Sequence, residues 1–131
     1  MAGVIPDRAK AMILAMLLKQ VPPEPLVLRL FINDREPHLD DTAARYLEPE
    51  GSGYAAIPLR GAEWTIDEGP PVRAEHTGAT FKFTGYVGDV WGYYVAQASG
   101  RMLWAERFER GPYRVLNWGD EIQVTPGITL Q

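Results

Sequence analysis

The sequence has no cysteine, only two histidines and no apolar run long enough to cross a bilayer. The missing cysteines exclude disulfides, thiolate catalysis and cysteine-based zinc sites. The longest apolar run covers residues 11–18, whereas a transmembrane helix needs roughly 20 residues. Basic charge is also scarce, because 13 Lys and Arg stand against 17 Asp and Glu. With a net charge of −4, a nucleic-acid-binding surface is not expected.

The apolar run resembles a signal peptide only at its beginning. Arg8 and Lys10 precede it, but Lys19 to Pro22 follow at once, without the small residues of a cleavage site. We therefore expect synthesis in the cytoplasm and no membrane association. The 131 residues, with 46% hydrophobic and 23% charged side chains, are typical of one soluble globular domain.

Residues 5–20 predict a single helix. Alanine, leucine and methionine are strong helix formers, Pro6 suits a first helical turn, and Asp7 favours the positive end of the helix dipole. Three prolines in the next five residues end the helix and stiffen the chain. We therefore divide the chain into an N-terminal helix with a proline-rich linker (1–25) and a β domain (26–131).

The β domain is expected to contain about eight short strands separated by Gly, Pro and Asp turns, a spacing typical of antiparallel sandwiches. We predict a jelly-roll-like β-sandwich. Residues 26–33 alternate, with the leucines and Ile32 on one face. Pro58 places its strand at a sheet edge. Residues 69–74 are interpreted as a breaker, and residues 75–83 as the strand that follows it.

Residues 90–108, VWGYYVAQASGRMLWAERF, predict a hairpin with Ser99 and Gly100 as a two-residue turn. This register pairs Ala96 with Leu103 and gives both faces apolar side chains. Such a hairpin belongs in the interior, covered by a second sheet and by the helix or a neighbouring subunit. The alternative is an exposed aromatic platform for a sugar, but these aromatics are spread over both faces.

Catalytic patterns are weak in this sequence. A triad of Ser52 or Ser99 with a histidine and an aspartate can be drawn in any chain of this size. A small hydrolase that uses Glu106, with Glu109 as a second carboxyl group, is another hypothesis, but nothing in the sequence fixes their separation. No phosphate loop or nucleophile elbow is present. We expect no catalytic residue and no cofactor.

Acidic residues cluster in residues 33–41, NDREPHLDD. Asp34, Glu36, Asp40 and Asp41 could supply oxygen ligands to a calcium ion, and the last two could serve a hydrolase. The spacing does not match an EF-hand loop, because no glycine stands at the turn. A solvated loop of charges is the alternative interpretation.

The helical segment is apolar all round in residues 11–18, whereas a surface helix buries one stripe. We therefore predict that it binds a neighbouring molecule, the alternative being a helix that caps an open end of the sandwich. The candidate interface residues are Met12, Ile13, Met16, Leu17, Tyr93 and Trp104.

Three short patterns carry a family resemblance. GYYV (Gly92 to Val95), MLWAERF (Met102 to Phe108) and GDEIQVTP (Gly119 to Pro126) resemble small β-rich structural proteins of tailed bacteriophages. The upstream LVLRLFIND, DTAARYLE and GYAAIPL are similar too, so the resemblance covers most of the chain. These motifs consist of turns and core residues, so they indicate a fold family rather than an activity.

The resemblance implies a virion protein, either a decoration or cement protein of the capsid or a subunit associated with the tail or a fibre. Its expected partners are the major capsid protein or other virion proteins, together with further copies of the chain in a homo-oligomer such as a trimer. Neither nucleic acid nor a membrane is an expected partner. A carbohydrate-binding adhesion module remains the alternative, suggested by the aromatic residues Trp91, Tyr93, Trp104 and Trp118.

Overall fold

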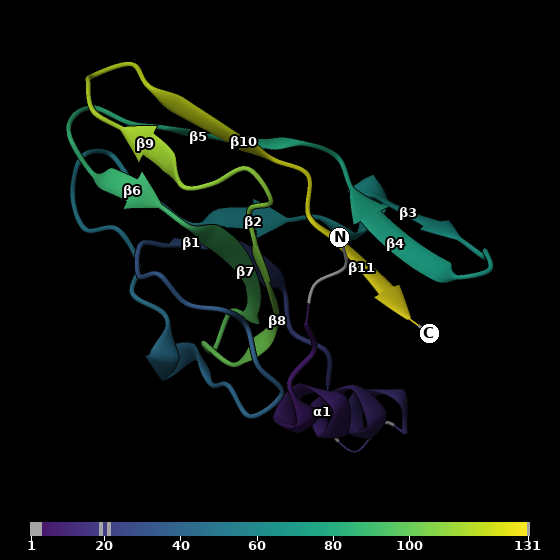
Figure 1. The fold of residues 1–131 in the computed structure, drawn as a ribbon. Helices are drawn as coiled ribbons and strands as arrows, with labels where there is room; N and C mark the ends of the chain where they lie inside the picture. Colours follow the sequence, from purple (N-terminus) through teal and green to yellow (C-terminus); the bar gives the residue numbers. More distant parts are fainter. Residues whose placement is uncertain (1–3, 19, 21, 131) are drawn as a thin grey trace.

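The computed structural model describes residues 4–18, 20 and 22–130. The fold is mainly β, with 39% strand and 14% helix, and its sheets are antiparallel. Among the described residues, the single α-helix precedes all the strands (Figure 1). The predicted fold class is therefore confirmed at this level.

The described residues contain eleven strands in four sheets. The largest sheet has the order β2 (Ile57–Leu59), β1 (Leu26–Phe31), β7 (Gly92–Gln97) and β8 (Met102–Arg107). A second has the order β11 (Gly127–Leu130), β4 (Val72–His76) and β3 (Trp64–Asp67). Two pairs are β10 (Glu121–Val124) with β5 (Ala79–Lys82), and β6 (Gly88–Val90) with β9 (Tyr113–Val115). The helical elements are α1 (Asp7–Leu17) and two 3-10 turns, η1 (Ala43–Arg45) and η2 (Gly61–Glu63).

The four-stranded sheet forms the centre of the core, because its two faces contribute to separate apolar clusters. On one face, Leu30 and Val95 pack in a cluster that also contains Phe81 of β5. On the other face, Tyr94 packs with Tyr46, which follows η1. All six residues of β7 are buried, so the predicted interior position of this hairpin is confirmed. Within the chain, the loop with η1 covers the second face, whereas Ala9 of α1 packs in the other cluster, so the predicted helix cover is wrong for this face.

The turn of the β7–β8 hairpin has three residues, 98–100, instead of the two predicted. The Gln97 amide donates to the carbonyl oxygen of Arg101 at 2.8 Å, which closes the loop. The Gly100 amide donates to the carbonyl oxygen of Gln97, also at 2.8 Å. Gly100 has a φ of +104°, which favours glycine at the last position of such a three-residue loop.

This longer turn changes the register near it. Ala96 pairs with Met102, so the predicted pairing with Leu103 is wrong. A bulge then restores the predicted partners Val95 and Trp104. Because a bulge sets two residues against one, Leu103 joins Trp104 in the larger apolar cluster, and Met102 lies in the opposite one.

Two further strand predictions need correction. The predicted breaker at residues 69–74 ends earlier, because Val72–His76 form β4, which pairs with both β3 and β11. Only the two prolines before Val72 lack the amide protons that a ladder requires. Residues 75–83 are consequently divided between β4 and β5. Pro58 lies in β2, an edge strand as predicted.

The segment before β1 is attached to the β strands at both of its ends. Val4 and Ala105 exchange two backbone hydrogen bonds of 2.8 and 3.1 Å, which cover part of the outer edge of β8. Ala9 of α1 is fully buried in the larger apolar cluster. Beyond the helix, the Glu24 carboxylate accepts hydrogen bonds from the amide and hydroxyl of Ser99, at 3.0 and 3.1 Å. The linker is thereby fixed to the hairpin turn.

Candidate functional site

Helix α1 contacts the β strands along one side only. Ala9 is fully buried, and Met12 and Met16 are half-buried. Four large apolar side chains in the helix and directly after it are exposed: Ile13 by 39%, Leu14 by 58%, Leu17 by 73% and Leu18 by 66%. We call these four residues the apolar ridge.

The spacing of these residues explains why they share one side. Ile13 and Leu17 are four residues apart, as are Leu14 and Leu18, so each pair lies on the same stripe of the helix. Single exposed leucines are common on protein surfaces and need no explanation. Four adjoining ones form an exposed apolar surface, which makes this side of the helix a candidate binding surface.

The six predicted interface residues fall into three groups. Ile13 and Leu17 lie on the apolar ridge, while Met12 and Met16 belong to the side that contacts the β strands. Tyr93 and Trp104 lie inside the chain, with exposed fractions of 2% and 6%. The sequence did not single out Leu14 and Leu18, because a helix that is apolar all round gives no signal as to which side docks.

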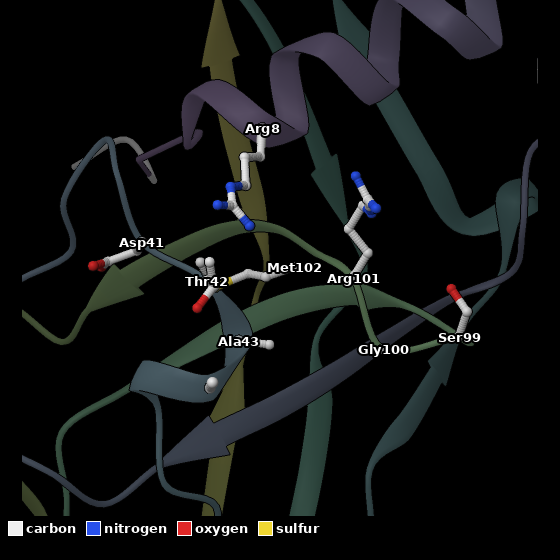
Figure 2. A pocket seen from close by; sticks show the side chains of 9 residues that line it. Arg8, Asp41, Thr42, Ala43, Ser99, Gly100, Arg101 and Met102 are labelled. Atoms are coloured by element: carbon white, nitrogen blue, oxygen red, sulfur yellow. The ribbon is translucent and has the colours of Figure 1, made fainter.

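A pocket of about 410 Å³ lies between the first turn of α1, the loop with η1 and the turn of the β7–β8 hairpin. Arg8 extends from α1 and Arg101 from the hairpin into the space between these elements (Figure 2). Met102 and Ala43 contribute apolar surface to the lining. The sequence analysis did not identify this site, because its residues meet only in the fold.

Asp41 also borders this pocket, but its carboxylate is fully engaged elsewhere. It accepts hydrogen bonds from the guanidinium of Arg35, from the Tyr46 hydroxyl at 2.5 Å and from the His38 amide at 2.9 Å. Burial alone would raise the pKa of Asp41, but these hydrogen bonds outweigh it and lower the pKa. Asp41 therefore stays ionised, with Arg35 as its counter-charge.

The rest of the acidic stretch is also paired with cations or with a histidine. Asp34 forms an ion pair of 2.5 Å with Arg107, and Glu36 lies 3.9 Å from the same guanidinium. Asp40 contacts the Nδ1 atom of His38 at 2.8 Å. Within residues 4–18, 20 and 22–130, no group of three or more His, Asp or Glu side chains is arranged to hold a metal ion.

The serine and histidine candidates are not brought together. The Ser52 hydroxyl donates to the carbonyl oxygen of Tyr86 at 2.8 Å, and the Ser99 hydroxyl donates to Glu24. Both ring nitrogens of the buried His76 bond to backbone groups, at 2.7 and 3.2 Å. These side chains therefore fix loops and do not form a nucleophile–base pair.

Glu106 and Glu109 line one shallow pocket of about 270 Å³. Glu106 accepts a hydrogen bond of 2.8 Å from the hydroxyl of Tyr93, which is buried. Burial raises the pKa of Glu106, against the opposing effect of that hydrogen bond. The geometry gives Glu106 a structural task, because it satisfies a hydroxyl group that has been removed from water.

The aromatic residues considered for sugar binding do not form a platform. Tyr93 and Trp104 are buried in the core. Trp91 is half-buried, and the guanidinium of Arg107 lies over its ring at 4.6 Å. Trp118, in the turn between β9 and β10, is 78% exposed. Of these residues, Trp118 presents the largest exposed aromatic surface.

Comparisons with known proteins identify no relative of this chain. No protein-family model, no curated protein and no solved structure matches the chain. Across the described part of the chain, no helix is sufficiently long and apolar to span a membrane. The two features that stand out are the apolar ridge and the adjoining pocket with its two arginines.

Proposed function

We propose that this chain is a structural protein of a tailed-bacteriophage particle, and that it decorates the capsid by binding the major capsid protein. The resemblance of residues 92–95, 102–108 and 119–126 to such proteins supports the phage assignment. The apolar ridge supports the binding role and is the observation that carries the proposal. A protein with this task requires an adhesive surface on a rigid body and no active site.

The ridge is large enough to contribute to binding. Full burial of one leucine side chain stabilises a complex by roughly 1.5–3 kcal/mol before the entropic cost of association. Three leucines and one isoleucine form the ridge, so one copy can attach with modest affinity. Many copies on one shell would strengthen attachment through multivalency.

The body that carries the ridge is, in this proposal, a jelly-roll-like β-sandwich. The larger apolar cluster combines side chains of β1, β7 and β8 with side chains of β5 and β10. Shared burial of this kind is what two sheets packed face to face require. The proline-rich linker, which the Glu24–Ser99 hydrogen bonds fix to the hairpin, would hold α1 in one orientation.

The proposal includes a homo-oligomer, for which a trimer matches the three-fold positions of a capsid. A subunit of the tail or of a fibre is the other location that the resemblance allows. A carbohydrate-binding adhesion module would instead depend on Trp118, the most exposed aromatic residue of those considered. Glycan-array binding that is lost in Trp118→Ala would support that function instead.

The test is binding to particles of the phage that encodes the chain, prepared without this protein. Purified protein would be added separately to tail-free heads and to free tails, and the bound fraction measured after sedimentation. We expect saturable binding to heads, and about tenfold weaker binding for Leu17→Gln because one buried leucine is lost. Saturable binding to tails alone would instead assign the protein to the tail.

The matched control is Ile66→Gln, because Ile66 of β3 is exposed to a similar degree as Leu17, 68% against 73%. This control should bind heads like the unaltered protein. Absence of binding to both heads and tails would contradict the proposal. Deletion of residues 1–20 is a poorer test, because it removes Ala9 from the core and Val4 from the edge of β8.

A further inference from the structure

We infer that the pocket beside α1 binds the carboxylate of an acidic side chain that the partner protein presents. This inference rests on the proposed function and extends it, because it gives the chemistry of the partner's contact segment. Arg8 and Arg101 would hold the carboxylate, and Met102 and Ala43 would contact the methylene groups before it.

The first argument is that these two arginines have no counter-charge. Within the described ranges, the side chains of Arg8 and Arg101 form no hydrogen bond or ion pair. Five other arginines do pair with a carboxylate, and these are Arg29, Arg35, Arg73, Arg107 and Arg114. Arg45, Arg60 and Arg110 also lack a carboxylate partner among the described residues, but Arg8 and Arg101 are the two that line this pocket together.

The second argument is that the nearby carboxylate cannot neutralise them. Figure 2 shows the Asp41 side chain directed away from both Arg8 and Arg101. Its oxygens are occupied by Arg35, Tyr46 and the His38 amide. The Glu24 carboxylate also lies beside this lining, where it accepts hydrogen bonds from the amide and hydroxyl of Ser99. Neither carboxylate pairs with Arg8 or Arg101, so both guanidinium groups remain available to a ligand.

The third argument concerns the kind of anion. A guanidinium presents its N–H groups in a planar fork that matches a carboxylate, and two forks can hold one group from both sides. The apolar part of the lining suits the methylene groups of a glutamate better than a free phosphate. A nucleic acid would need an extended basic surface, whereas the chain has net charge −4.

The position of the pocket connects it to the apolar ridge. Arg8 lies in the first turn of α1, and the ridge begins at Ile13 of the same helix. A partner segment that covers α1 would therefore bring an acidic residue to the pocket and apolar residues to the ridge. The apolar contact would supply most of the affinity, and the arginines would set the orientation of the segment.

The first experiment measures head binding by the double variant Arg8→Glu and Arg101→Glu. The control is Arg60→Glu, because Arg60 is also exposed and its side chain has no partner among the described residues. We expect binding about tenfold weaker or more for the double variant, and unchanged binding for the control. Circular dichroism spectra of all three proteins should agree.

The outcomes separate this inference from the proposed function. If the double variant binds heads like the unaltered protein while Leu17→Gln does not, the pocket inference is overturned and the proposed function stands. If the double variant loses self-association instead of head binding, the occupant is another copy of this chain, and the inference is overturned as well.

The second experiment does not require the phage. A hexaglutamate peptide would be titrated into the full chain, and the Nε–Hε NMR signals of Arg8 and Arg101 followed at constant ionic strength. We expect both signals to shift saturably, and the Arg60 signal to stay in place. Absence of saturable shifts would overturn the inference, as would saturation by inorganic phosphate at lower concentrations than by the peptide.

Discussion

Strand β7 and helix α1 are both rich in apolar residues, but the side chains of β7 are buried and most of those of α1 are not. All six residues of β7 are buried, with one apolar cluster on each side of the strand. In α1 only Ala9 is buried, and the apolar ridge is exposed to solvent. The difference shows that an apolar stretch of sequence does not by itself predict burial within the same chain.

The comparison also separates stability from binding. Substitutions in β7 disturb packing on two faces, so they should alter the free energy of unfolding. Substitutions on the apolar ridge remove contacts that the isolated chain does not make, so they should alter association alone. Substitutions in β7 and in the groups that fasten its surroundings should therefore cost the most stability, and substitutions on the apolar ridge the least.

The largest effect is expected at Gly92, the first residue of β7. A Cβ atom there would lie 2.3 Å from the carbonyl oxygen of Glu106 and 2.5 Å from the Phe31 ring. We predict that Gly92→Ala lowers the free energy of unfolding by about 3 kcal/mol, as measured by urea denaturation. Gly61→Ala, where no atom lies within 4 Å, should change it little. Equal stability of the two variants would contradict the tight packing described for β7.

Asp41 fastens the loop with η1, which covers the second face of the central sheet. Asp41→Asn should lower the free energy of unfolding at pH 7 by about 2 kcal/mol, because it removes charged hydrogen bonds. The folded pKa of Asp41 is lowered, so its contribution is complete above the ordinary carboxyl pKa and is lost as the pH falls through the folded value. The two proteins should therefore converge in stability towards acid pH, whereas a constant difference would contradict this assignment.

Ionisation of Glu106 should have the opposite effect on the stability of the fold. Burial raises its pKa, so ionisation disfavours the folded state and stability falls as the pH rises past the ordinary carboxyl range. Glu106→Gln keeps an acceptor for the Tyr93 hydroxyl and removes the charge. We predict a gain below ~1 kcal/mol at pH 7 and no gain near pH 3, from thermal unfolding at both pH values. A loss of stability at pH 7 would show that the charge stabilises the fold.

The smallest effect on stability is expected on the apolar ridge. Leu17 is 73% exposed, so Leu17→Gln should change the free energy of unfolding by less than about 0.5 kcal/mol. The same substitution is predicted to weaken head binding about tenfold. A large loss of stability in the isolated protein would indicate that Leu17 contacts its own chain, and would remove the contrast with β7.

Local patterns in the sequence predicted much of the fold. The proline-flanked helix and the edge position of Pro58 depend on neighbouring residues, and both were confirmed. The strand predicted for residues 26–33 was confirmed over Leu26–Phe31. The hairpin register was partly wrong, because Ser99-Gly100 fits a two-residue or a three-residue turn equally well. In the fold, the three-residue turn and the bulge beside it place Leu103 in the larger apolar cluster.

The candidate site was less predictable than the fold. The sequence indicated a helix with more apolar surface than one buried side needs, and the exposed ridge agrees with this. The sequence could not indicate which side of the helix packs on the β strands and which side is exposed. Arg8 and Arg101 are 93 positions apart, and only the fold brings them to one pocket. Arginines that lack a counter-charge cannot be identified before the ion pairs of the other arginines are known.

The absence of native cysteines allows a direct test of the central claim that the apolar ridge is covered in the assembled particle. Leu17→Cys, with Ile66→Cys as the control, would be labelled with a maleimide in the free protein and in intact phage. The account predicts that both cysteines react in the free protein, and that in the particle Leu17→Cys is protected while Ile66→Cys still reacts. Equal labelling of Leu17→Cys in the free protein and in the particle would contradict it.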